Sequence, residues 1–175
     1  MTGRPSQLAE EVCFLVLDVD GVLTDGRLLY AERNPDDIKG FDIKDGLGIK
    51  LAQAAGIDVA IITGRQSDAV SRRADDLGIA TVLQGREDKG TALTELAASS
   101  GLSLNQIAYM GDDLPDLPAI KMAGIGACPS DAIEIVRQAA DWVSPFSGGQ
   151  GAVRSLCDFL LDSQGKMSGI LRKYQ

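Results

Sequence analysis

The sequence predicts an α/β fold: a Rossmann-like, three-layer sandwich in which a mainly parallel β-sheet lies between two layers of helices. Short apolar runs alternate along the chain with longer segments of helical periodicity, as in successive βα units. The runs are apolar throughout rather than at every second residue, which is typical of strands buried on both faces of a parallel sheet. The 175 residues are enough for one full core, so we expect residues 1–175 to form a single domain.

The first predicted strand is the run FLVL at residues 14–17, and it ends abruptly in two aspartates. Later apolar runs predict strands at residues 59–62, 81–83, 107–110 and 125–128. Apolar residues at helical spacing predict helices at residues 67–77, 88–100, 114–123, 131–140 and 151–161. Gly78 and Gly101 mark two of the helix ends.

Residues 26–42 break this rhythm, because they contain no convincing helical pattern. Apolar residues at 28–30 and 38–43 flank a polar loop at 32–37, which predicts a β-hairpin of about residues 26–43 that projects from the sheet. An exposed hairpin that carries Leu, Tyr, Ile and Phe is prone to association unless it is covered. We therefore expect the chain to form oligomers through this hairpin.

The composition excludes several classes of function. The net charge of −8 disfavours nucleic acid as a partner, because a phosphate backbone needs a basic surface. The chain has no His, which excludes Ser-His-Asp triads, Cys-His pairs and His-ligated zinc. Any catalysis must therefore use carboxylates, Lys, Arg, hydroxyl groups or a metal ion held by oxygen ligands.

The cysteines and the apolar content give an expectation about the compartment. Cys13, Cys128 and Cys157 are too few and too scattered for a disulfide framework, which fits a reducing cytosol. The first ten residues lack the apolar core of a signal peptide. No apolar stretch approaches the roughly 20 residues that span a membrane. We expect a cytoplasmic protein without a membrane partner.

Polar residues follow three of the predicted strands, and a lysine lies at the start of the predicted helix at 88–100. If the strands are parallel, all of these residues gather at one edge of the sheet. These residues are Asp18 and Asp20, then Thr63, Gly64 and Arg65, then Lys89, and finally Asp112 and Asp113. Clustered carboxylates repel one another unless a cation neutralises them, and a set of oxygen ligands suits Mg²⁺. Asp116, a little further on, is interpreted as an acid of a first helical turn that the helix dipole favours.

This set of residues has a coherent chemical use. One carboxylate can attack phosphorus to form an aspartyl-phosphate. A second carboxylate, two residues on, can protonate the leaving alcohol and then activate water. The Thr63 hydroxyl, backbone N–H groups and Lys89 can hold the phosphoryl oxygens while charge develops on them.

The same residues carry a resemblance to a known family. The segments DVDGVLTDG, IITGR, QGREDKGTAL and YMGDDLPD resemble, in order, the four motifs of the haloacid dehalogenase-like phosphatases. The short stretch between the first two motifs leaves no room for a large cap domain, so the hairpin takes its place. The segments GFDIKDGLGIK (residues 40–50), TGR (63–65) and GGQGAVR (148–154) are similar to the 3-deoxy-D-manno-octulosonate 8-phosphate (Kdo 8-phosphate) phosphatases.

The resemblance implies a phosphoric monoester hydrolase that needs Mg²⁺ and converts Kdo 8-phosphate to Kdo and phosphate in lipopolysaccharide precursor synthesis. It also implies a homotetramer in which hairpins meet at the centre and neighbouring subunits complete each active site. The C-terminal tail, about residues 162–175, is expected to contribute to a neighbour's site.

The resemblance also implies roles for individual residues. Asp18 resembles the nucleophile and a metal ligand, and Asp20 resembles the general acid and base, with its backbone carbonyl on Mg²⁺. Asp112 resembles the third protein ligand of the metal. Asp113 resembles an acid that lies behind the metal ligands, and Lys89 the cation that steadies the nucleophile and the phosphate.

The remaining roles concern the substrate. Thr63 and Gly64 resemble the pair that binds the phosphate. Arg65 is a candidate for the sugar carboxylate, a task that suits a planar fork of donors. Lys44 and Asp45 are further candidates for substrate contacts, although they could equally form a surface pair and a helix N-cap.

Two departures from the family leave the sugar open. The chain has Gln150 where the family often has Arg, and Ser155 where it often has Glu. A nine-carbon sialic or deaminated sialic acid 9-phosphate therefore remains an alternative substrate, although Arg65 after Thr-Gly favours the eight-carbon sugar. A catalytically silent relative is a further alternative.

The alternative from outside the enzymes is a phosphoryl-accepting receiver domain, which also gathers Asp, Thr and Lys around Mg²⁺. In receivers an adjacent acidic pair ends the first strand and the phosphorylated Asp ends a later one. Here the spaced pair, Asp18 and Asp20, comes first and the adjacent pair comes late, so the order disfavours a receiver.

Overall fold

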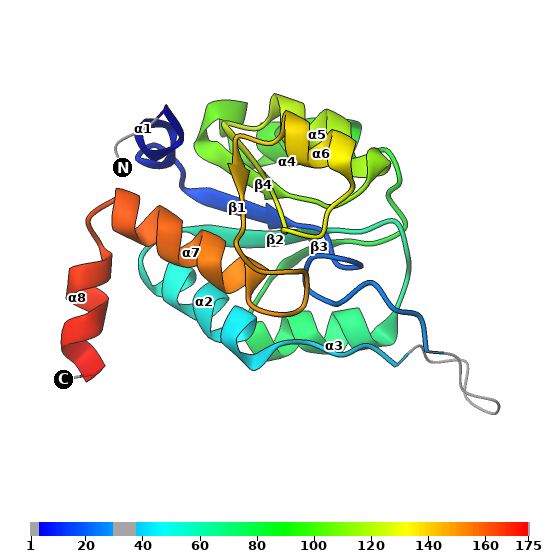
Figure 1. Ribbon diagram of the computed structural model, residues 1–175, viewed down its shortest axis with the longest axis horizontal. Helices are drawn as coiled ribbons and strands as arrows, with labels where there is room; N and C mark the ends of the chain where they lie inside the picture. Colours follow the sequence, from blue (N-terminus) through cyan, green and yellow to red (C-terminus); the bar gives the residue numbers. More distant parts are fainter. Residues whose placement is uncertain (1–3, 30–37, 175) are drawn as a thin grey trace.

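The computed structural model describes residues 4–29 and 38–174, and it confirms the α/β sandwich (Figure 1). In the described part of the chain, six strands form one sheet in the order β3-β2-β1-β4-β5-β6, and each neighbouring pair is parallel. The strands are β1 (Phe14–Leu17), β2 (Asp58–Ile62), β3 (Thr81–Leu83), β4 (Ile107–Met110), β5 (Ile125–Cys128) and β6 (Trp142–Val143).

Helices cover both faces of the sheet. The α-helices are α1 (Arg4–Ala9), α2 (Ile43–Ala54), α3 (Asp68–Leu77), α4 (Lys89–Ser100), α5 (Leu117–Met122), α6 (Glu134–Ala139), α7 (Ala152–Ser163) and α8 (Met167–Leu171). The described residues also form short 3₁₀ helices, η1 (Leu104–Gln106), η2 (Leu114–Asp116) and η3 (Arg172–Tyr174). Figure 1 shows α4, α5 and α6 on one face of the sheet, and α2, α3 and α7 on the other.

The strands are apolar throughout because their residues alternate between two cores. In β1, Leu15 and Leu17 pack in the core on the side of α2 and α7, whereas Phe14 and Val16 pack in the core on the side of α4 and α5. All four residues are buried. Each fully buried side chain of this kind stabilises the fold by roughly 1.5–3 kcal/mol.

The parallel register brings the ends of three strands together. Leu17 at the end of β1 lies beside Ile61 of β2 and Met110 of β4. The chain runs outward from β1 to β2 and β3, and then returns to place β4 on the other side of β1. Such a switch point opens a crevice outside the carboxyl ends of the strands.

The region of the predicted hairpin agrees with the prediction only in part. Among the described residues, one antiparallel bridge joins Leu29 to Ile38. The predicted strand at residues 38–43 is wrong at its end, because Ile43 begins α2 and the side chain of Asp42 caps this helix by accepting a hydrogen bond from the Lys44 N–H. Residues 30–37, which include the predicted loop at 32–37, lie outside the described residues.

Helix α2 was missed because glycines lower the helical propensity of its sequence. The packing of α2 against α7 explains one of them. A Cβ atom on Gly48 would lie 2.9 Å from Cδ of Arg154 and 3.0 Å from its Cα, so only glycine lets the two helices approach this closely. Tertiary packing therefore outweighs local propensity here.

Smaller differences concern the ends of elements. The predicted helix at 114–123 is split into η2 and α5, and the predicted helix at 131–140 is shortened to α6. The elements α1, β6 and α8 were not predicted. No helix in residues 4–29 and 38–174 has the length and apolar character needed to cross a membrane.

Candidate active site

Asp18 is the first residue after β1, and the sheet itself fixes its backbone. Its N–H donates a hydrogen bond of 3.0 Å to the carbonyl of Met110 in β4. Its carboxylate Oδ1 lies 2.7 Å from Nζ of Lys89, the first residue of α4. Both side chains are buried, so the two opposite charges face each other in the protein interior.

Asp116 completes this arrangement: it lies in the first turn of η2, as the sequence predicts, but its carboxylate is buried among the site residues, which the sequence interpretation did not anticipate. Its side chain is 2% exposed. Oδ1 accepts hydrogen bonds from Nζ of Lys89 at 2.9 Å and from the hydroxyl of Tyr109 at 2.6 Å, and Oδ2 accepts from the N–H groups of Asp112 and Asp113 at 3.2 Å each. Asp116 therefore fixes both the cation of the site and the loop after β4. Its place within YMGDDLPD was the one signal in the sequence.

Asp112 packs directly against the loop that follows β1. Gly21 has φ +89°, and a Cβ atom on it would lie 2.1 Å from Oδ2 of Asp112. Only glycine fits here, for reasons of both space and backbone conformation. Carboxylate oxygens of Asp18, Asp112 and Asp116 all lie within 4.8 Å of one another.

The charges of this cluster are unbalanced. Burial, together with the charge of Asp116, raises the pKa of Asp18 to about 7 against the pull of Lys89. Burial and the charges of Asp116 and Asp18 raise the pKa of Asp112 to about 7. Burial lowers the pKa of the Lys89 ammonium, but the negative charges of Asp18 and Asp116 outweigh this effect. The pKa of Lys89 is therefore raised above its usual value.

A divalent cation fits these residues. The side-chain donors are all oxygen atoms, as Mg²⁺ requires. The two oxygens of Asp116 already accept four hydrogen bonds, so Asp116 is better placed to orient its neighbours than to bind a metal. Asp18 and Asp112 are the carboxylates that would hold the ion.

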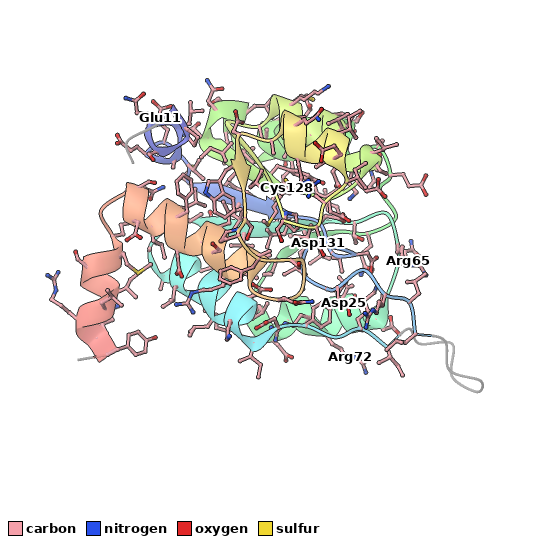
Figure 2. The ribbon with its side chains drawn as sticks, viewed as in Figure 1. Glu11, Asp25, Arg65, Arg72, Cys128 and Asp131 are labelled. Atoms are coloured by element: carbon pink, nitrogen blue, oxygen red, sulfur yellow. The ribbon has the colours of Figure 1, made fainter. Side chains whose placement is uncertain are left out.

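The loop after β2 forms the opposite wall of the site. Thr63 is 2% exposed, and its N–H donates to the carbonyl of Leu83 at 2.9 Å, so β3 holds it in place. Gly64 and Arg65 follow it into the same cavity. In Figure 2, Arg65 lies at the end of the molecule that is remote from Glu11 and the C terminus.

One cavity of about 340 Å³ brings these groups together, within the size range of small-molecule sites. It is lined by Asp18, Asp20, Gly26, Thr63, Gly64, Arg65, Glu87, Lys89, Asp112, Asp113, Pro115 and Asp116. A larger hollow of about 690 Å³ lies between α2 and α8, but its described lining residues include no carboxylate. We therefore place the chemistry in the smaller cavity.

Two sequence candidates lie outside this cavity. Asp45 is buried in α2, where Oδ1 accepts from the N–H of Arg154 at 2.7 Å and Oδ2 from the N–H of Gly151 at 3.4 Å. It therefore caps the start of α7, and burial raises its pKa to about 6. Lys44 borders another hollow, together with Gln150. The structure places neither residue in the cavity of its own chain.

The glycine-rich segment before α7 packs over the loop that carries Asp20. Gly149 donates its N–H to the carbonyl of Val22 at 2.9 Å, and Gly148 donates its N–H to Oδ1 of Asp131 at 3.0 Å. A Cβ atom on Gly148 would lie 1.9 Å from the carbonyl oxygen of Gly21. The loop after β1 is therefore held between Gly148 on one side and Asp112 on the other.

Comparisons with known proteins agree with this geometry. The family model of the haloacid dehalogenase-like hydrolases matches residues 78–156. The 3-deoxy-D-manno-octulosonate 8-phosphate phosphatase of Salmonella typhi is 42% identical over 159 residues, which are 91% of this chain and 84% of that protein. The chain belongs to this phosphatase family. The family's enzyme from Haemophilus influenzae is 44% identical over 162 residues, 93% of this chain and 89% of that protein.

Solved structures of the Kdo 8-phosphate phosphatase family share the whole fold. The Moraxella catarrhalis enzyme, crystallised with a magnesium ion, a phosphate ion and Kdo, has a TM-score of 0.97 at 39% identity and covers 100% of both chains. The cobalt-bound Haemophilus influenzae enzyme has a TM-score of 0.89 at 43% identity, over 93% of this chain and 94% of that one.

Proposed function

We propose that this chain is a magnesium-dependent phosphatase that hydrolyses Kdo 8-phosphate to Kdo and inorganic phosphate. One observation carries the proposal: the carboxylate of Asp18 is buried 2.7 Å from the ammonium of Lys89, in a cavity that Thr63 and Asp112 also line. The arrangement pairs a nucleophile with groups that stabilise a phosphoryl anion. The named activity of its relatives supports the choice of sugar phosphate.

In the first step, a carboxylate oxygen of Asp18 attacks phosphorus while the bond from phosphorus to the sugar oxygen breaks. Asp20 gives its proton to the departing oxygen, so the sugar leaves as an alcohol and Asp18 carries the phosphoryl group. Lys89, which Asp116 holds at 2.9 Å, stabilises the negative charge of the phosphoryl oxygens together with Thr63.

In the second step, water attacks phosphorus and gives a proton to the carboxylate of Asp20. The bond between phosphorus and the Asp18 oxygen breaks, which releases phosphate and restores both side chains. When bound by Asp18, Asp112 and the backbone carbonyl of Asp20, Mg²⁺ supplies positive charge against the phosphoryl oxygens. Asp113 caps η2 by accepting from the N–H of Leu114 at 2.7 Å, and we assign it a supporting role behind the metal ligands.

The remaining substrate contacts are proposed for the sugar. Arg65 borders the cavity and can bind the sugar carboxylate with two parallel hydrogen bonds, and Gly64 leaves room for the phosphate. Lys44 would meet a substrate only in the site of another subunit, because it lies outside the cavity of its own chain. For Asp45, capping of α7 is the role that its hydrogen bonds support.

We further propose a cytoplasmic homotetramer in which neighbours complete each site. Exposed apolar side chains beside the residue 30–37 segment support an interface there, since Leu29 is 51% and Ile38 57% exposed. All three cysteines are free thiols, which suits a reducing compartment. Light scattering coupled to size-exclusion chromatography would measure the oligomer, and a monomer at working concentration would contradict the tetramer.

A sugar-phosphate panel with Mg²⁺ tests the substrate. We expect the highest kcat/KM for Kdo 8-phosphate, with lower values for the 9-phosphates of sialic and deaminated sialic acid. A preference for a nine-carbon substrate would replace the sugar but keep the reaction. A long-lived phosphorylated protein without turnover would instead indicate a receiver, and no phosphate release from any ester would indicate a silent relative.

A further inference from the structure

Lys39 is half-buried as a whole but has a buried side chain, and the roles assigned above do not use it. Its side chain is only 2% exposed, and its ammonium forms an ion pair with Oδ1 of Asp20. The preceding residue, Ile38, is bridged to Leu29, which fixes the segment against the chain that leaves the loop after β1. Lys39 therefore has a defined position in the fold.

The burial of Lys39 requires a partner of opposite charge. A buried ammonium is strongly destabilising unless a carboxylate and good hydrogen bonds compensate for the lost water. The side chain of Asp20 is 23% exposed and borders the catalytic cavity. The ion pair therefore links the protein interior to the cavity: the Lys39 side chain is buried, and Asp20 lines the cavity.

The pair also limits how Asp20 can act. An ammonium held against Oδ1 leaves Oδ2 as the oxygen that can exchange a proton. Oδ1 can accept from Lys39 whether or not Oδ2 carries a proton, and transfer of that proton to the leaving oxygen restores the full ion pair. A charge-assisted hydrogen bond further restricts rotation of the carboxyl group, which a partly exposed aspartate would otherwise sample. Proton transfer in a phosphatase needs such a fixed geometry.

We propose that Lys39 is the positioning residue for Asp20: it binds Oδ1, so that Oδ2 gives the proton to the leaving alcohol and later takes one from water. This inference rests on the proposed phosphatase function and assigns to it a residue outside the four motifs. Lys39 acts through Asp20 and makes no contact with the transferred phosphoryl group in this scheme.

Two esters with different leaving groups distinguish a positioning role for Lys39 from direct contact with the phosphoryl group or damage to the fold. A sugar alcohol must be protonated as it leaves, whereas 4-nitrophenolate leaves as a stable anion. Single-turnover experiments with enzyme in excess isolate the first step for each ester. We expect Lys39→Met to slow release of the sugar roughly 10²-fold or more, the scale of general acid catalysis, and to slow release of nitrophenolate less than about tenfold.

Two further variants sharpen the test. Lys39→Arg keeps a cation beside Asp20, so we expect it to recover most of the rate lost in Lys39→Met. In an Asp20→Asn background, Lys39→Met should have little further effect, because both changes remove the same proton transfer. The double variant also removes both charges, which guards against loss of the fold through an unpaired buried charge.

Lys121→Met is the control for loss of a lysine. Lys121 is exposed in the last turn of α5, and it does not line the catalytic cavity. Equal slowing of both esters by Lys39→Met would overturn the proposal and indicate contact with the phosphoryl group or damage to the fold. Unchanged rates, or additive effects in the double variant, would overturn it as well.

The comparison uses the sugar phosphate that the wild-type protein hydrolyses fastest. If this sugar is not Kdo 8-phosphate, the proposed substrate fails while the ratio between the two leaving groups still tests Lys39. Failure of the positioning role and failure of the substrate assignment can therefore be told apart.

Discussion

Asp18 has the surroundings of a nucleophile, with a buried cation on one side and a second carboxylate, Asp112, nearby. We expect Asp18→Asn to lower kcat by more than about 10³-fold, because an amide cannot form the acyl phosphate. The fold should survive, since Asn keeps the shape and removes a charge that burial disfavours. Asp58→Asn, at the opposite end of the sheet, is the control. Phosphate release by Asp18→Asn near the wild-type rate would remove Asp18 as the nucleophile.

Asp45 should make stability depend on pH. Burial raises its folded-state pKa from 3.8 to about 6, so the folded protein binds a proton more tightly than the unfolded chain. The stabilisation from this proton is complete below pH 3.8 and is lost as the pH rises to about 6, by about 3 kcal/mol.

The variant Asp45→Asn cannot lose that proton. With saturating Mg²⁺ in both samples, the Tm of Asp45→Asn relative to wild type should therefore rise by several degrees between pH 4 and pH 7. Differential scanning calorimetry across this range measures the effect. Parallel Tm curves for the two proteins would show that Asp45 does not titrate in this window.

For single residues, the sequence predicted the positions at strand ends but not the burial of side chains in loops. The strand ends located Asp18, Thr63 and Asp112, because apolar runs reveal where a buried strand stops. Nothing comparable reveals where a side chain in a loop points. Asp116 fits the dipole of a first helical turn equally well, and Lys39 lies in a segment that was interpreted as a strand. Their burial follows from long-range contacts alone.

At the scale of elements, the segment before α7 acts as a clamp on the loop after β1. Gly148→Ala would press on the carbonyl of Gly21, 1.9 Å from the new methyl group, and displace the backbone that carries Asp20. We expect kcat to fall roughly 10²-fold, as a misplacement of about 1 Å does in other enzymes. Steady-state kinetics and Tm should be measured together.

Gly124→Ala is the control for steric damage alone. Its methyl group would lie 2.1 Å from the carbonyl oxygen of Asn105, a similar clash at the opposite edge of the sheet. We expect a comparable loss of Tm with kcat of the folded protein retained. If both variants lose kcat in proportion to Tm, the clamp has no specific role in positioning the loop.

The elements themselves were predicted unequally. β1, β3, β4 and β5 are where the apolar runs placed them, because burial on both faces leaves a continuous pattern. α2 escaped prediction because its glycines serve packing rather than local propensity. β6 has only two residues, too few for a periodic signal.

At the scale of the whole molecule, metal binding should be coupled to stability. EDTA should abolish phosphatase activity and Mg²⁺ restore it, and Mg²⁺ at 100 times its Kd should stabilise the fold by about 2.7 kcal/mol. Asp112→Asn should lose the rise in Tm along with activity, which calorimetry can record without a substrate. Full activity in EDTA would overturn the metal assignment.

The C-terminal tail cannot serve the site of its own chain from where it lies. Gln164 donates to the carbonyls of Ala9 and Val12 at 2.8 and 2.7 Å, so the tail begins at the edge of the sheet opposite the cavity. Truncation after Lys166 removes α8 and keeps these hydrogen bonds. If the tail completes a neighbour's site, KM for the sugar phosphate should rise about tenfold, the loss of one or two polar contacts.

The kinetics of 4-nitrophenyl phosphate provide the control, because this ester has no sugar for the tail to contact. They should stay unchanged in the truncated protein. Unaltered KM for the sugar phosphate would show that the tail is a spectator, and equal losses for both esters would point to damage of the fold.

The position of β1 between β2 and β4 has a consequence for synthesis of the protein. A ribosome makes β1 first, with Asp18, the proposed nucleophile, and then β2 with Thr63, but the second neighbour of β1 emerges only after α4. Until then the nascent sheet has an unpaired apolar edge, which invites aggregation. The proposed mechanism implies that neither half of the chain hydrolyses phosphate esters alone, because Asp18 and Thr63 lie in one half and Asp112 in the other. Activity therefore appears only when the last central strand has closed that edge.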